Sequence, residues 1–195
     1  MYKILAILFL LVGQVIIYSC HLPHDKEIIC ETSFKKARDL AYKNPTDISA
    51  LDSALGIVNR CMQCDSIKTT VVDLKMDLLI TLGRYDDGVK FIDSLKPSDF
   101  IFPYKKTLSH DNFITLTYAA KGDTLSRDKV YIKMANDLEM YIKTNNLTSK
   151  EFKEAFTELN GLQVKFMDKV ALNRKIDSFI VKYSDEEKFL NFFKR

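Results

Sequence analysis

Apolar residues recur at every third or fourth position from Lys26 to the end of the chain. This spacing places them on one face of a helix, because an α-helix completes a turn in 3.6 residues. In the first such segment, residues 26–43, the apolar stripe is formed by Ile29, Phe34, Ala37, Leu40 and Ala41. No segment alternates between apolar and polar residues as a half-buried strand does. The pattern therefore predicts an all-α protein.

Prolines, glycines and capping residues divide this pattern into separate helices. Pro45 and Pro97 interrupt it, because proline has no amide hydrogen and restricts the residue before it. Gly83 and Gly122 suit helix ends, where a left-handed backbone is common. Thr148 to Glu151 has the form of a capping box. We expect helices over about residues 26–43, 47–63, 66–82, 85–95, 104–121 (or 109–121) and 126–143, and others beginning near 149, 176 and 187. Thr46 or Asp47 should cap the second helix, and Asp65 or Ser66 the third.

The first 19 residues follow a different pattern. Lys3 is the only charged residue before Cys20, and residues 4–17 are almost entirely apolar. A helix that spans a bilayer needs about 20 apolar residues, so this shorter run is typical of a secretory signal. An uncleaved anchor is the alternative interpretation.

The signal ends in Ile17-Tyr18-Ser19-Cys20. This resembles the lipobox of bacterial lipoproteins, and the bulky Tyr18 is similar to the looser lipoboxes of Bacteroidetes lipoproteins. The resemblance implies a signal peptide over 1–19, palmitate-type acylation of Cys20, and a lipid anchor that holds the protein in the cell envelope outside the cytoplasm, with the outer membrane favoured over the inner. Residues 20–25 would form a tether and residues 26–195 a single helical domain. A plain signal followed by a coincidental cysteine is the alternative.

Part of the helical domain repeats itself. Residues 51–55 (Leu-Asp-Ser-Ala-Leu) align with residues 85–89 (Tyr-Asp-Asp-Gly-Val), 34 residues later. Helix pairs with this period resemble the tetratricopeptide repeat, and so does a glycine at the turn (Gly83) followed by Tyr85 and the small Gly88. The resemblance implies antiparallel helix pairs stacked as a short array over 26–143, with the helices of 148–195 as a cap. The third unit is only partial beyond residue 122. The alternative is an irregular helical bundle in which the similarity at a spacing of 34 residues is coincidental.

Composition and charge narrow the function classes. The chain has 195 residues, of which 47% are hydrophobic and 28% charged, as in a folded domain. Its formal net charge is +3, and basic residues are interleaved with acidic ones. Proteins that bind nucleic acid usually carry a clustered basic face, so we expect no nucleic-acid partner.

Three cysteines remain after Cys20. Cys61 and Cys64 form a C-x-x-C motif, but no strand-helix-strand unit and no second ligand pair accompanies it, so we expect neither redox catalysis nor a metal. If the first two helices pair antiparallel about Pro45, then Cys30, 15 residues before it, lies level with Cys61, 16 residues after it. We expect a disulfide from Cys30 to Cys61, with Cys64 as the competing partner, because exported compartments preserve such bonds. Three free buried thiols are the alternative.

No arrangement of residues in the sequence indicates catalysis. His110 is the only histidine outside the tether, and its neighbour Asp111 should not face it, because adjacent helix positions point apart. The sequence contains no nucleophile elbow, phosphate-binding loop or zinc-protease motif. We therefore expect no enzyme, no cofactor and no catalytic residue.

These observations favour a membrane-anchored helical module that binds another protein or a peptide. The tetratricopeptide resemblance implies a concave face, towards which Asp73, Asp77 and Asn112 would project. These three are the candidate partner-binding residues. The alternatives are an inhibitor or immunity protein that neutralises a toxin at the membrane and, less favoured, an enzyme.

Overall fold

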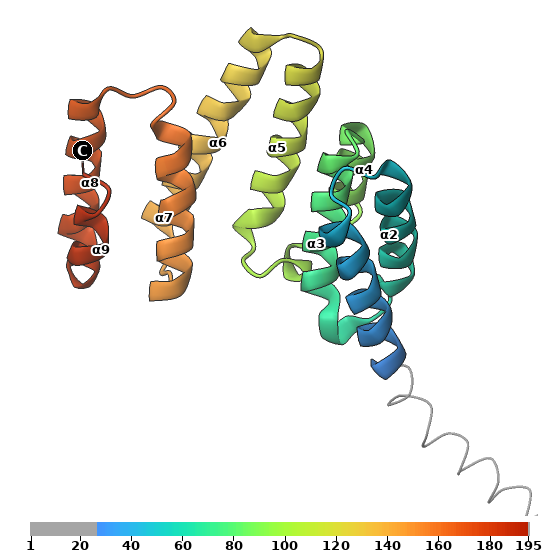
Figure 1. Ribbon diagram of the computed structural model, residues 1–195. Coiled ribbons are helices and arrows are strands. Elements are labelled where there is room, and N and C mark those ends of the chain that lie inside the picture. The colour runs from blue at the N-terminus through green and yellow to red at the C-terminus, as the bar shows by residue number, and fades with distance from the viewer. Residues whose placement is uncertain (1–26, 195) are drawn as a thin grey trace, which may run out of the picture. The chain divides into compact units, whose positions relative to one another are not determined.

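The computed structural model describes residues 27–194, and every regular element within them is a helix (Figure 1). The all-α prediction is confirmed, and neighbouring helices pack against one another. The predicted signal peptide, Cys20 and the tether lie outside the described residues. The helices are an N-terminal helix over residues 27–43, α2 (Ile48–Cys61), α3 (Lys68–Thr81), α4 (Tyr85–Asp93), α5 (Tyr104–Ala120), α6 (Thr124–Thr144), α7 (Ser149–Gln163), α8 (Lys169–Lys182) and α9 (Glu187–Asn191).

The chain divides into two compact units, one ending at Gly83 and the other beginning at Arg84. The first unit holds the N-terminal helix, α2 and α3. Its core consists largely of side chains that the apolar stripes predict, among them Phe34, Ala37, Leu51, Leu55, Val58, Val71 and Leu78. Ile29, also predicted to point inward, is 65% exposed. The buried stripe of this helix runs through its neighbour Cys30 instead.

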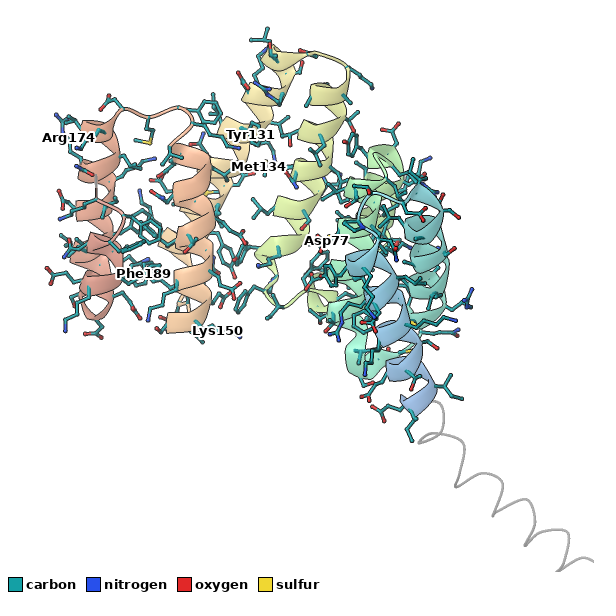
Figure 2. The ribbon with its side chains drawn as sticks, viewed as in Figure 1. Asp77, Tyr131, Met134, Lys150, Arg174 and Phe189 are labelled. Atoms are coloured by element: carbon teal, nitrogen blue, oxygen red, sulfur yellow. A yellow bond between two sulfur atoms is a disulfide. The ribbon has the colours of Figure 1, made fainter. Side chains whose placement is uncertain are left out.

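The second unit holds α4 to α9, in which α4 packs on α5, α5 on α6, α6 on α7 and α8 on α9. One core joins its last four helices, through Met134, Leu138, Ile142, Phe152, Phe156, Leu159, Ile176, Phe179 and Leu190. Aromatic rings concentrate there: the centroid of the Phe152 ring lies 4.1 Å from that of Tyr183, and Phe189 lies among the same rings (Figure 2). The C-terminal helices therefore share their core with α6.

Two glycines end helices at the predicted turns. Gly83 and Gly122 have φ angles of +67° and +72°, a left-handed conformation that glycine adopts without steric cost. After Gly122, the amide of Asp123 donates to the carbonyl of Tyr118 at 3.0 Å, which closes the end of α5. This turn makes α5 and α6 a hairpin (Figure 1).

A third glycine is required by packing. Gly88 of α4 faces Phe113 of α5, and a Cβ atom at position 88 would lie 2.1 Å from Cε1 of that ring. Phe113 is only 1% exposed, so its ring has no free space to move into. The small residue that the repeat resemblance implies at this position is what allows α4 and α5 to approach.

One of the two predicted side-chain caps in the first unit forms. An Asp47 carboxylate oxygen accepts two hydrogen bonds from backbone amides of the first turn of α2, at 2.9 and 3.2 Å, so Asp47 and not Thr46 caps that helix. The prediction that Asp65 or Ser66 caps the third helix is wrong. Both residues belong to a 3-10 turn, and α3 begins at Lys68 without a side-chain cap.

Candidate binding site

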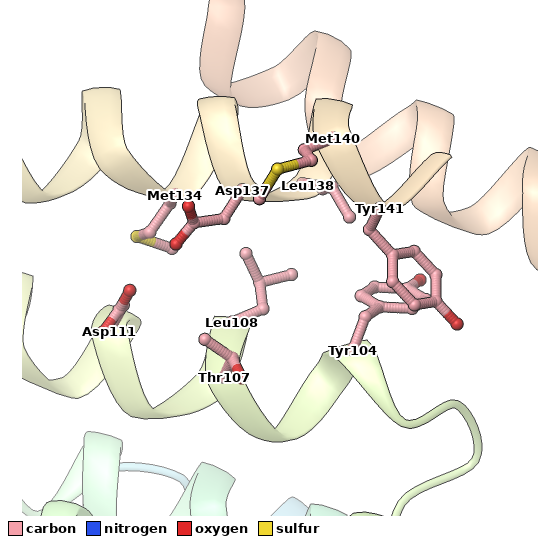
Figure 3. A pocket seen from close by; sticks show the side chains of 9 residues that line it. All are labelled: Tyr104, Thr107, Leu108, Asp111, Met134, Asp137, Leu138, Met140 and Tyr141. Atoms are coloured by element: carbon pink, nitrogen blue, oxygen red, sulfur yellow. The ribbon is translucent and has the colours of Figure 1, made fainter. Parts of the chain in front are cut away.

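A cavity of about 330 Å³ lies between α5 and α6, and we call it the α5–α6 cavity (Figure 3). Its size is at the lower end of the range for ligand pockets. The walls between its two ends are apolar and are formed mainly by Leu108, Met134, Leu138 and Met140. Asp111 and Asp137 lie at one end, and the rings of Tyr104 and Tyr141 lie at the other (Figure 3).

The carboxylate end holds a single lysine. Lys133 Nζ lies 2.6 Å from Asp111 Oδ2 and 2.9 Å from Asp137 Oδ2. The Asp111 side chain is 8% exposed, whereas the Lys133 side chain is 54% exposed. The hydrogen bond to Asp111 is the main reason that the pKa of Lys133 is raised. One ammonium group is therefore shared between two carboxylates that line the cavity.

His110 contacts the same buried carboxylate. Its Nδ1 lies 3.2 Å from Asp111 Oδ1, and its Nε2 lies 3.5 Å from Asp93 Oδ1 in α4. The prediction that His110 and Asp111 would not meet is wrong, because the imidazole is long enough to reach its neighbour's side chain. The two oxygens of Asp111 thus have different partners, His110 and Lys133, which fixes the orientation of the carboxylate.

The tyrosine end is closed by two rings whose centroids lie 5.2 Å apart. The hydroxyl of Tyr141 donates to Glu151 Oε1 at 2.6 Å, and burial together with this contact raises the pKa of Tyr141 to about 12. Glu151 therefore does not complete the predicted capping box, although Thr148 does accept the amide of Glu151 at 3.3 Å. Tyr104 is 7% exposed and its hydroxyl has no hydrogen-bond partner among the described residues.

Carboxylates outnumber ammonium groups around the α5–α6 cavity. Beyond the tyrosines, Lys105 Nζ lies 3.1 Å from both Glu154 and Glu158 of α7. Burial raises the pKa of Glu158, against the effect of Lys105. The cavity lining itself contains two charged residues, the carboxylates Asp111 and Asp137, and one ammonium group, that of Lys133, contacts both. The charge of the lining therefore favours a cationic ligand.

The three predicted binding residues do not form one site within either unit. Asp73 and Asp77 are both exposed on α3 of the first unit, where Figure 2 labels Asp77. Asp77 lines a second cavity of about 300 Å³. Partial burial raises the pKa of the Asp77 carboxyl. Asp73 does not line that cavity. Asn112 lies on α5 in the second unit and does not line the α5–α6 cavity, although its neighbour Asp111 does.

The sequence carries a signal for the carboxylate end that the sequence analysis missed. Asp111 lies 11 residues before Gly122 and Lys133 lies 11 residues after it. In a helical hairpin that turns at Gly122, these two positions are level with each other. Cys30 and Cys61 are spaced in nearly the same way about Pro45.

The disulfide joins Cys30 to Cys64, with the two Cα atoms 6.1 Å apart. The preferred pairing with Cys61 is wrong, the competing pairing is present, and the alternative of three free thiols is wrong. Cys61 is a buried free thiol whose Sγ lies 3.9 Å from the carbonyl oxygen of Cys30. Cys61 is thus level with Cys30, as expected, but its side chain meets the backbone of that residue. Burial raises the pKa of the Cys61 thiol, so it is mainly protonated.

Residues 27–194, which the structure describes, contain neither a candidate metal cluster nor a membrane-spanning helix. Within this range, no group of three or more histidine, cysteine, aspartate and glutamate side chains is arranged to hold a metal ion. No helix in the same range is long and apolar enough to cross a bilayer.

Comparison with known proteins gives no match: no family model fits the chain, and no curated protein or solved structure is significantly similar to it.

Proposed function

We propose that this protein is a membrane-anchored helical module that binds a segment of another protein in the α5–α6 cavity. The observation that carries the proposal is the composition of that cavity, which combines apolar walls with two carboxylates at one end. Such a site recognises an apolar group of a partner and fixes its orientation by charge. A lipid on Cys20 would hold the module in the cell envelope.

The walls suit a protein side chain. Burial of one large aliphatic side chain contributes about 1.5–3 kcal/mol, and a cavity of about 330 Å³ can hold only a few such groups. Met134 and Met140 contribute unbranched, polarisable side chains that adapt to the shape of a ligand. A partner segment would therefore be anchored by few residues, which favours a reversible contact.

Photo-crosslinking in the native cell tests this proposal. A photoreactive phenylalanine analogue replaces Thr107, which is exposed and lines the cavity, or Ala119, an exposed residue of the same helix outside it. We expect position 107 to capture one partner protein and position 119 to capture none. Equal capture at both positions, or capture at neither, would contradict binding in the α5–α6 cavity.

The anchor is tested separately by Cys20→Ser in the full-length chain. Without the acyl chains, membrane binding falls steeply, because each buried methylene contributes about 0.8 kcal/mol. We expect the wild-type protein in the membrane fraction and the variant in the soluble fraction or uncleaved. Fatty acid on the variant, or no fatty acid on wild type, would exclude Cys20 as the anchor.

A further inference from the structure

The carboxylate end of the α5–α6 cavity already binds an ammonium group, which belongs to the protein itself. Asp111 and Asp137 lie on different helices, yet one ammonium nitrogen, Lys133 Nζ, contacts both of them at 2.6 and 2.9 Å. The gap between the two carboxylates therefore fits a single ammonium group. Hydrogen bonds between an ammonium and a carboxylate are short and strong at such distances.

Lys133 is the replaceable member of this arrangement. The side chain of Asp111 is 8% exposed, so its charge would be left without compensation if no cation were present. The side chain of Lys133 is 54% exposed and does not line the cavity. Water can solvate the Lys133 ammonium when it leaves, whereas water reaches Asp111 poorly.

The cavity offers its own path to the same carboxylates. Leu108, Met134 and Leu138 form an apolar wall that leads to Asp111 and Asp137 (Figure 3). A group that followed this wall would carry an apolar chain and end in a cation. A lysine side chain, with four methylenes and a terminal ammonium, has this form.

We propose that the α5–α6 cavity receives a lysine side chain of the partner, whose ammonium displaces Lys133 from Asp111 and Asp137. The inference rests on the proposed function and specifies the chemistry of the partner. Lys133 then acts as an internal competitor that keeps Asp111 neutralised while the cavity is empty. When the ligand enters and Lys133 leaves, the ion pairs of Lys133 with Asp111 and Asp137 are lost.

Small alkyl probes test this inference on the mature chain from residue 20, with Cys20→Ser so that no lipid or detergent is present. The methyl groups of the methionines are labelled with ¹³C, and their NMR signals are followed during titration with n-hexylammonium. Met134 and Met140 line the cavity, whereas Met62, Met76 and Met167 do not. We expect saturable shifts of the first two signals only.

Two comparison ligands separate the effect of the charge on binding from the effect of the alkyl chain. n-Hexanol has the same chain without the charge and should bind about tenfold more weakly, and n-hexanoate should not bind. Equal binding of n-hexanol would show a purely apolar cavity and would overturn the inference. Stronger binding of n-butylguanidinium than of n-hexylammonium would overturn the assignment of an ammonium.

Three variants test the competition. Lys133→Met removes the internal cation and should raise the affinity for n-hexylammonium several-fold, because the ammonium group that contacts both carboxylates is then absent. Asp137→Asn should lower it, and Lys129→Met, an exposed lysine one turn away on α6, should leave it unchanged. Thermal unfolding of each variant verifies that it is folded. Unchanged affinity in Lys133→Met would overturn the displacement.

Different results would overturn the proposed function and the assignment of a lysine side chain as the ligand. Crosslinking from position 107 without any preference for n-hexylammonium would overturn the lysine assignment and leave the proposed function intact. Binding of n-hexylammonium with no crosslinked partner would overturn the proposed function.

Discussion

Among the glycines that the structure describes, Gly88 is the one at which an added Cβ atom would clash. Helix propensity alone would make Gly88→Ala stabilising by up to about 1 kcal/mol. The Cβ atom would lie 2.1 Å from the ring of Phe113, however, and forcing extra atoms into a packed core costs about 1–3 kcal/mol or more. We therefore expect Gly88→Ala to lower the free energy of unfolding by about 1–3 kcal/mol in urea titrations.

The matched control is Gly56→Ala in α2, where no heavy atom lies within 4 Å of the added Cβ. It should leave stability unchanged or raise it. If Gly88→Ala were as stable as Gly56→Ala, the close approach of α4 and α5 would be wrong.

Glu139 links stability to pH. It accepts hydrogen bonds from Lys143 at 2.5 Å, Gln163 at 3.1 Å and Lys175, and its side chain is 12% exposed. Burial acts to raise the pKa of Glu139, but the two lysines outweigh it and hold the pKa below its ordinary value. Because the folded-state pKa is depressed, the stabilisation is complete above the ordinary glutamate pKa of about 4.3 and is lost as the pH falls through the folded-state value.

We expect Glu139→Gln to lower the free energy of unfolding at pH 7 by about 1–3 kcal/mol, the range for hydrogen bonds to charged groups. The difference from wild type should shrink when urea titrations are repeated below pH 4. A difference that stays constant or grows on acidification would contradict the lowered pKa.

At the scale of elements, α8 completes the C-terminal end of α6. The hydroxyl of Tyr183 donates to the carbonyl of Ile142 at 2.6 Å, and Lys182 Nζ contacts the carbonyls of Ile142 and Lys143. Carbonyls in the last turn of a helix lack partners within the helix, and the negative end of the helix dipole attracts a cation. These two residues therefore couple the end of one helix to another.

We expect Tyr183→Phe to lower the free energy of unfolding by about 1 kcal/mol, because it removes one hydrogen bond and keeps the ring stacked on Phe152. Tyr42→Phe, at a tyrosine that is 67% exposed, is the control and should have no effect. The comparison uses chemical denaturation of both variants. A neutral Tyr183→Phe would show that the Ile142 carbonyl is equally well satisfied by water.

The helices were predictable because their signals are local. Apolar periodicity, Gly83, Gly122 and Asp47 each act within a few residues of the element that they define. The contacts that build the α5–α6 cavity are not local: Lys133 meets Asp111 across a turn, and the direction of each side chain depends on packing. For the same reason, the prediction that Cys61 lies level with Cys30 was correct, whereas the prediction that these two residues form the disulfide was wrong.

At the scale of the whole molecule, the disulfide joins the N-terminal helix to the residues that precede α3. It closes a loop of 34 residues, and a loop of this length stabilises by about 3–4 kcal/mol in the entropic model. We expect reduction, or Cys64→Ser, to lower the melting temperature, and Cys61→Ser to preserve the bond. Mass spectrometry after alkylation in denaturant without reduction should find one modified thiol among residues 27–194, at Cys61. Modification of Cys30 or Cys64 would contradict the pairing.

Filling the α5–α6 cavity from within shows whether the partner occupies it. Leu108 lines it and is only partly buried, so Leu108→Trp adds a ring into the empty space at little cost to packing. The measurement is the amount of partner captured in the cell by this variant relative to wild type, at equal membrane abundance. We expect Leu108→Trp to lose capture with an unchanged or higher melting temperature. Capture at the wild-type level by the filled protein would exclude binding of the partner in this cavity.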